Sequence, residues 1–179
     1  RAILSLDRNI VEFYVSAYQS WLFNRVLAVR LHCIDQVLPG DLAWRHDNGA
    51  VFRVEDADAE QPRAARFEIS PSGPLFGSRM TTPSREPGSI EQRILDESHH
   101  TIDDFPRSGP FRCTGGRRAL RFQPKDVGVE EGTDEHGGFI ELRFTLPSGC
   151  YATCILREIC KDRLEEGLSD AEADETKAR

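Results

Sequence analysis

The pattern of apolar and polar positions first predicts one long helix. Over residues 10–32 the apolar side chains recur at three- and four-residue steps and cover most of the helix circumference, so we expect a largely buried helix capped by Asp7 or Asn9. A narrow polar stripe follows it at four-residue steps. We interpret the stripe as solvent-facing or internally satisfied, and a stripe facing a functional cleft is the alternative. Its members are Glu12, Ser16, Ser20 and Asn24.

Two short strands follow the helix. Residues 42–44 and 51–54 are apolar, and they flank a turn that contains Asn48 and Gly49. Asn-Gly is a strong signal for a tight turn because both residues tolerate positive φ. The pattern therefore predicts a β-hairpin.

The next stretches predict a loop and a second helix. Residues 70–77 hold two prolines and two glycines around a Leu-Phe pair, which predicts an ordered loop anchored by apolar side chains. Ser72 in this loop does not have the spacing of a nucleophile elbow. Ser89 and Gln92 form a capping box for a helix over about residues 90–99.

A clear period-two pattern returns in residues 140–146, which predicts a strand buried on one face. A Pro-Ser-Gly turn follows, in which Ser148 can cap a short helix. Cys150 and Tyr151 would then lie on the first helical turn, at the carboxyl end of the strand. Ligand contacts are common at this position in open sheets.

Composition narrows the class of protein. The chain has 179 residues, of which 39% are hydrophobic and 30% charged, and it has no apolar run of membrane-spanning length and no secretory leader. Five cysteines without a CxxC pair speak against a disulfide framework. We expect a cytoplasmic protein with reduced thiols. Because the sequence starts at Arg1 and leads directly into a patterned helix, we also expect a segment of a longer protein.

Charge is unevenly distributed along the chain. Residues 112–125 hold five basic and no acidic residues, whereas residues 126–141 hold six acidic and no Lys or Arg. In the basic run, Gly116 precedes Arg117 and Arg118, so the backbone can approach a ligand closely while planar guanidinium groups face phosphate. A glycine hinge followed by solvated arginines explains the same residues equally well.

Other chemistry-bearing residues give weaker signals. A Cys150 thiol at a helix N-terminus could be a nucleophile, but the sequence nominates no partner base, so a structural thiol is the better interpretation. Neither Cys150 with Cys154 nor the pair His99-His100 has the further ligands that a zinc site needs. Tyr151 offers a flat face for a nucleobase, or it fills the core.

Five stretches together resemble one family, the TruD-type tRNA pseudouridine synthases. They occur in the family's order and cover most of residues 10–160, so the resemblance rests on more than a single motif. The stretches are residues 15–31, 39–42, 69–77, 116–121 and 144–158.

The resemblance implies an α+β fold in which an α/β insertion domain is followed by the C-terminal strands and helix of a pseudouridine-synthase catalytic sheet. Residues 1–114 would be mostly insertion domain and residues 115–161 the C-terminal part of the catalytic domain. The loop-rich stretch before Gly116 agrees with this boundary. Residues 162–179 are acidic and predict a frayed or disordered tail.

The implied reaction converts one uridine of tRNA to pseudouridine, at position 13 in the bacterial family, without metal or organic cofactor. The family's catalytic aspartate lies in a Gly-x-Lys-Asp stretch that is missing here, so this segment is expected to be inactive alone, and neither Asp41 nor Asp126 replaces it. The expected partner is tRNA, with no membrane and no oligomer. A non-catalytic RNA-binding module is the alternative, and a hydrolase built on Cys150 is a third hypothesis.

The resemblance also nominates site residues. Tyr151 occupies the position of an aromatic residue beside the target base. Arg157 would support the charge of the active site or brace the helix. We expect Arg117, Arg118 and Arg121 to contact the tRNA backbone.

Overall fold

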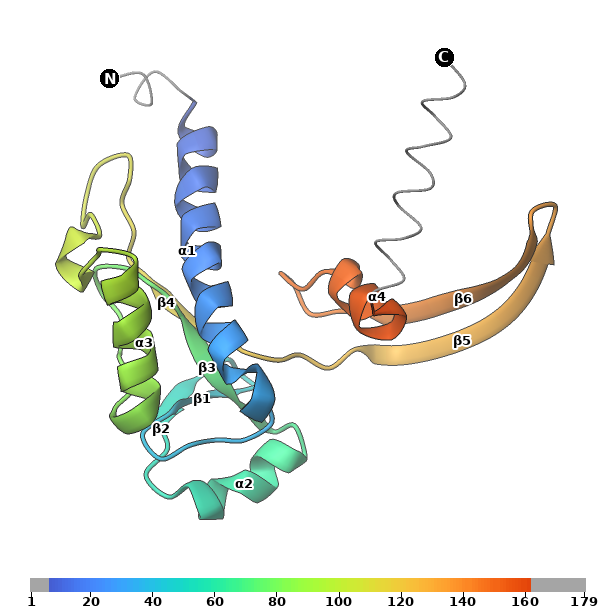
Figure 1. Ribbon diagram of the computed structural model, residues 1–179, viewed down its shortest axis with the longest axis horizontal. Helices are drawn as coiled ribbons and strands as arrows, with labels where there is room; N and C mark the ends of the chain where they lie inside the picture. The colour runs from blue at the N-terminus through green and yellow to red at the C-terminus, as the bar shows by residue number, and fades with distance from the viewer. Residues whose placement is uncertain (1–6, 162–179) are drawn as a thin grey trace. The chain divides into compact units, whose positions relative to one another are not determined.

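The computed structural model describes residues 7–161, and the chain divides into two compact units on either side of the bond between Arg121 and Phe122. The first unit contains a four-stranded sheet with three α-helices, and the second contains a two-stranded ribbon with one α-helix (Figure 1). This mixture confirms the α+β class. The tail predicted from Asp162 onward lies outside the described residues.

Helix α1 (Arg8–Arg30) is the long predicted helix, followed by a single 3₁₀ turn, η2 (Leu31–Cys33). Asp7 is its N-cap and accepts a hydrogen bond from the Asn9 amide at 2.8 Å. The prediction of a largely buried helix is wrong for this structure, because α1 packs one side only, against a sheet strand and a second helix. Its other side leaves several large apolar residues exposed. They are Ile10, Phe13, Tyr14, Tyr18 and Trp21.

The sheet of the first unit has the strand order β2-β1-β3-β4, and each neighbouring pair is antiparallel. Strands β1 and β2 form the hairpin that the Asn-Gly turn predicts, which confirms it. The strands are β1 (Leu42–Arg45), β2 (Val51–Arg53), β3 (Ile69–Leu75) and β4 (Gly116–Ala119).

Strand β3 corrects the prediction of a loop over residues 70–77. Proline lacks an amide hydrogen and is rare in central strands, but its carbonyl still accepts, as Pro71 does from the Leu120 amide at 2.9 Å. Gly73 in the same strand lets α1 come close, because a β-carbon there would lie 2.8 Å from the Phe23 ring. Two prolines and a glycine, residues typical of loops, are therefore part of a buried strand here.

Two further helices pack on the sheet. Helix α2 (Ala57–Ala65) precedes β3, and helix α3 (Arg85–Glu97) follows it. Helix α3 begins before the predicted position, with Ser84 as N-cap, so the capping-box prediction is wrong. The Ser89 hydroxyl instead donates to the carbonyl of Arg85, one turn back. A short 3₁₀ turn, η3 (Ile102–Asp104), leads into the loop before β4.

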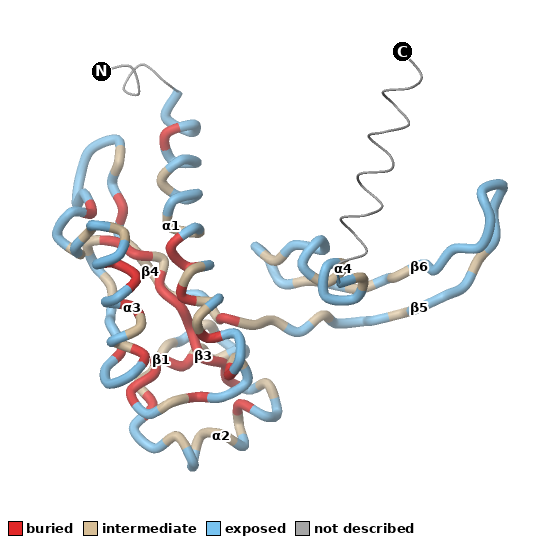
Figure 2. Tube along the Cα trace, in the orientation of Figure 1, coloured by how far each residue is buried: buried red, intermediate tan, exposed pale blue. Residues whose placement is uncertain are grey.

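The core of the first unit consists of two clusters. The larger one joins α1 and α3 through Leu22, Val26, Ile94 and Leu95, with Phe76 at the end of β3. The smaller one contains Ala64 of α2 together with sheet residues. Buried positions accordingly concentrate on β1, β3 and the facing side of the helices (Figure 2).

The second unit is a long antiparallel ribbon followed by a helix. Its elements are β5 (Lys125–Asp134), β6 (Gly137–Thr145) and α4 (Ala152–Cys160). Strand β6 confirms the predicted strand, but the predicted burial of one face is wrong for this structure: Ile140 is exposed, and Leu142 and Phe144 are only half-buried.

The turn after β6 differs from the prediction. Gly149 adopts a φ of 81°, and the N-cap of α4 is Tyr151 rather than Ser148. Cys150 therefore precedes the helix instead of lying on its first turn.

Gly73→Ala tests the close approach of α1 to β3. We expect the free energy of unfolding to fall by about 1–3 kcal/mol, because the added methyl group meets Phe23 and Leu120 in a packed interior. Urea unfolding followed by tryptophan fluorescence measures it. Gly116→Ala in β4 is the control, since a β-carbon there has no neighbour within 4 Å. Equal stability of the two variants would contradict the packing argument.

Candidate nucleic-acid interface

Arg117 in β4 lies inside the first unit. Its Nη1 and Nη2 donate to the two carboxylate oxygens of Glu91 in α3 at 2.9 and 2.8 Å, and its Nε donates to the Ser72 hydroxyl at 3.1 Å. The Arg117 and Glu91 side chains are 5% and 7% exposed. Such a bidentate pair uses most donors of the guanidinium and ties α3 to the sheet.

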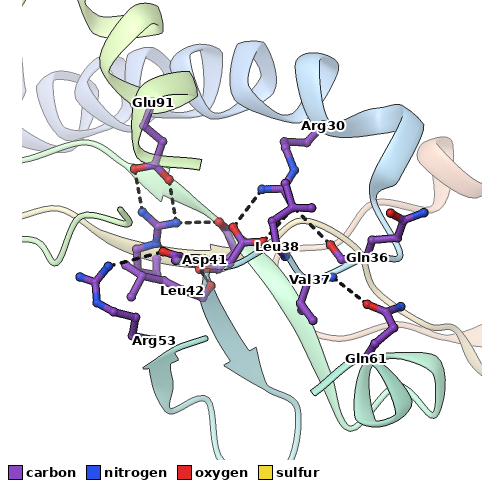
Figure 3. A network of polar contacts seen from close by, with 12 residues as sticks. Arg30, Gln36, Val37, Leu38, Asp41, Leu42, Arg53, Gln61 and Glu91 are labelled. Carbon is purple, nitrogen blue, oxygen red and sulfur yellow. Dashed lines mark hydrogen bonds and ion pairs between the residues drawn. The ribbon is translucent and has the colours of Figure 1, made fainter. Parts of the chain in front are cut away.

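Burial dominates the electrostatics of this pair. It raises the pKa of Glu91, and the nearby Arg117 guanidinium opposes the shift without cancelling it. In Figure 3 the Glu91 carboxylate points down from α3 to its two hydrogen-bond donors. Ser72 belongs to the same cluster, since its hydroxyl also donates to the Leu42 carbonyl. This buried hydroxyl is structural.

A second buried pair joins α1 to the beginning of β1. Arg30 donates from both terminal nitrogens to Asp41, each at 2.9 Å, and the Leu38 amide donates to the same carboxylate at 2.8 Å (Figure 3). Burial alone lowers the pKa of Arg30, but the hydrogen bond and charge of Asp41 raise it overall. Asp41 is therefore fully engaged, which agrees with the expectation that it is no nucleophile.

The two other arginines predicted to contact RNA, Arg118 in β4 and Arg121 just after it, differ in their surroundings. Arg121 places its guanidinium 4.3 Å from the centre of the Phe67 ring and donates to the Ser70 hydroxyl at 2.9 Å, and burial lowers its pKa. Arg118 is exposed, lies 5.7 Å from the centre of the Phe23 ring, and forms no ion pair with the part of the chain that the structure describes. Of the three arginines, Arg118 is the most accessible to a ligand.

Tyr151 and Arg157 lie in the second unit. The Tyr151 side chain is 68% exposed, and Arg157 is exposed on α4 without an ion pair to residues 7–161. The only histidine of the described part of this unit, His136, lies in the turn between β5 and β6. The nine residues of β6 separate it from the turn that holds Cys150, a length of about 30 Å at the usual rise per residue, so His136 does not lie beside the thiol.

Within residues 7–161, no group of three or more His, Cys, Asp or Glu side chains is arranged to hold a metal ion. Among these residues there is also no helix of the length and apolarity that a membrane span requires.

Glu91 is the residue that the sequence analysis missed. It lies on the apolar side of α3, between Pro87 and the pair Ile94 and Leu95, at helical spacing. A carboxylate within an apolar stripe is costly unless it is paired. That position is the signal that could have predicted a buried arginine partner.

Comparisons with known proteins agree with one another. The family model described as tRNA pseudouridine synthase D (TruD) matches residues 1–159. A tRNA pseudouridine synthase D from Geobacter sulfurreducens is 51% identical over 161 residues, which cover 90% of this chain and 38% of that protein. The same enzyme from Geotalea daltonii is 45% identical, with 90% and 40% covered.

A solved structure gives the same result. The crystal structure named for tRNA pseudouridine synthase D (TruD) of Methanosarcina mazei matches with a TM-score of 0.70 and 26% identity, over 86% of this chain and 38% of the other. The chain thus spans about two fifths of the length of the relatives it matches.

Arg117→Ala tests the buried pair. We expect a loss of about 3–5 kcal/mol in the free energy of unfolding at pH 7, because Glu91 keeps a buried charge without its partner. Arg66→Ala, which removes an exposed arginine paired with Glu68, should cost less than about 1 kcal/mol. The loss should shrink at low pH. Burial already raises the folded-state pKa of Glu91, and removing the Arg117 guanidinium, which opposes that shift, should raise it further. A protonated Glu91 carries no unpaired charge, so the stabilisation from proton binding is present at low pH and is lost as the pH rises through the folded-state pKa. Urea unfolding at pH 5 and pH 8 measures the effect, and a loss that does not depend on pH would contradict it.

Proposed function

Since the chain belongs to the TruD family of tRNA pseudouridine synthases, we propose that it forms part of an enzyme that isomerises one uridine of tRNA to pseudouridine, at position 13 as in the bacterial family. The observation that carries the proposal is the exposed Tyr151 ring, at the N-cap of α4 within the matched residues. The proposal includes tRNA as the substrate and the cytoplasm as the compartment.

Residues 1–114 are proposed to be mostly the insertion domain, and residues 115–161, which include β4 and the described part of the second unit, the C-terminal part of the catalytic domain. Support comes from the ribbon, because an isolated two-stranded sheet is marginally stable in water. Its apolar side chains are ready to pack against further strands. Those exposed in the described residues are Val127, Val129, Phe139 and Ile140.

Tyr151 is proposed to stack on the target base after the base has left the helical stack of the tRNA. Extruding a base costs a few kcal/mol, and an aromatic face recovers about 1–3 kcal/mol of it. Arg157, six residues further along α4, would support negative charge near the bound base. The catalytic aspartate is proposed to come from the remainder of a longer protein.

The proposed reaction needs no oxidant and no cofactor. The glycosidic bond between the ribose and N1 of uracil breaks, the base turns, and a bond forms between the ribose and C5. The proton of C5 leaves and N1 gains one, so atoms and electrons balance. The task of this chain is to hold the base and the RNA backbone during the exchange.

Tyr151→Ala in the longer protein tests the stacking role. We expect pseudouridine formation in an unmodified tRNA transcript to slow by about 5- to 100-fold, because the aromatic face is lost. Tyr151→Phe keeps the ring and should retain most of the activity. If the Ala variant isomerises uridine at the rate of the unchanged protein, the assignment of Tyr151 fails.

Arg118→Ala tests the proposed contact between β4 and the tRNA backbone. The neighbouring Arg117 and Arg121 are both held by hydrogen bonds inside the first unit, so Arg118 is the arginine that the geometry favours for a phosphate contact. We expect weaker tRNA binding across sequences and a salt slope reduced by about one contact. Filter binding at several salt concentrations measures it, and an unchanged slope would refute the assignment.

The alternative is an RNA-binding module without catalysis. Both hypotheses predict the same effect of Arg118→Ala, but only the synthase predicts pseudouridine in the product. Binding of tRNA without any isomerised uridine, by a protein that includes the residues upstream of Arg1, would favour the module.

A further inference from the structure

Outside the residues considered so far, the first unit has a hollow lined by three arginines. Arg8 from the first turn of α1 lies across from Arg107 and Arg112, both in the loop between η3 and β4. The hollow has a volume of about 410 Å³, and Ser108, Gly109 and Pro110 complete its wall. In Figure 1 this loop rises beside the N-terminal half of α1.

The positive charge in this hollow is only partly neutralised. Arg8 is paired with the exposed Glu12 at 2.8 Å, and Arg107 lies 3.9 Å from the exposed Asp103. Arg112 forms no ion pair with any residue in the described range 7–161. Exposed pairs of this kind contribute little and exchange readily for a stronger acceptor. Three guanidinium groups around one hollow suit a phosphate.

An aromatic cavity of about 270 Å³ is lined by the same helix and the same loop. Pro106 and Phe111, which line this cavity, are next in sequence to Arg107 and Arg112, which line the hollow. Tyr14 and Tyr18 line it from α1, while Phe105 and Phe111 line it from the loop. The His100 ring packs edge-on against the Tyr18 ring, with 5.6 Å between the ring centres. Flat apolar walls with a few polar groups are typical of a pocket for a planar ring.

The polar groups of the cavity suit a base. Asp104 uses one carboxylate oxygen to accept from the amide and the hydroxyl of Thr101 at 2.7 and 2.9 Å. Its other oxygen has no donor among the described residues, so it can accept from a ring N–H. At the floor, the Cys113 thiol contacts the Phe76 carbonyl, and burial raises its pKa, so the floor stays neutral.

We propose that the hollow and the cavity together bind one nucleotide of single-stranded RNA, with its phosphate among Arg8, Arg107 and Arg112 and its base between the Tyr14 and Phe111 rings. Charge complementarity identifies the occupant, because an apolar peptide would leave three guanidinium groups without a counter-charge. The inference rests on the proposed function for the kind of RNA. It adds a binding site in the first unit, apart from Tyr151 in the second.

Binding of two short RNAs by the 179-residue chain tests the site. The probes are a fluorescein-labelled oligouridine of twelve nucleotides and its abasic counterpart, which keeps the phosphates and lacks the bases. Arg112→Ala should weaken binding of both probes by about 5- to 20-fold at low salt, and reduce the salt slope by about 0.7. Fluorescence anisotropy gives both quantities.

Tyr14→Ala should weaken binding of oligouridine by about 5- to 100-fold and leave the abasic probe unchanged. Phe139→Ala is the matched control, because Phe139 is an exposed aromatic residue of the second unit that does not line the cavity. Arg66→Ala, at the end of α2, is the control for charge. Circular dichroism confirms that each variant is folded.

Three results would overturn the site: no binding of oligouridine by the unchanged chain, equal binding by Arg112→Ala and Arg66→Ala, or a Tyr14→Ala loss that is the same with and without bases. The last result would indicate a basic surface that binds RNA without recognising its bases. None of these outcomes bears on pseudouridine formation, which is measured separately on the longer protein, so the two proposals fail independently.

Discussion

The first unit depends on a charge pair that water does not reach. Arg30 ends α1 and Asp41 begins the sheet, and their side chains are 3% and 1% exposed. Removing either partner would leave the other charged and buried, which is among the most costly defects in a protein interior. The same carboxylate also accepts from the Leu38 amide, so it fixes the connection between helix and sheet as well as their distance. Helix α1 also packs closely over Gly73, a second contact that holds the helix on the sheet.

The second buried pair, Arg117 with Glu91, makes two neighbouring arginines of β4 differ in accessibility. Arg117 and Arg118 are adjacent in β4, and adjacent residues of a strand point to opposite faces. One face is covered by α3, whose Glu91 meets Arg117, and the other leaves Arg118 accessible. Two arginines that look equivalent in the sequence thus have different surroundings. The proposed phosphate contact therefore falls to Arg118, whose guanidinium is accessible.

Local periodicity predicted the elements whose pattern belongs to one segment: helix α1, the hairpin of β1 and β2, and strand β6. Strand β3 could not be predicted this way, because its Pro71 and Gly73 look like loop residues until the neighbouring strands and α1 supply their contacts. The site was partly predictable for a related reason. Type and spacing nominate arginines and Tyr151, but which side chain is buried depends on Glu91, a partner far away in the sequence.

The ribbon of β5 and β6 has a consequence for handling the protein. Within the described residues both of its edges lack a neighbouring strand, and exposed edges are templates for pairing with other chains. Acidic residues along the ribbon, including Glu130, Glu131 and Glu141, repel the same residues of a second copy. High salt would screen that repulsion and leave the apolar side chains of the ribbon to associate. Colloidal stability at high ionic strength is therefore limited by this unit, far more than by the well-packed helices and sheet of the first.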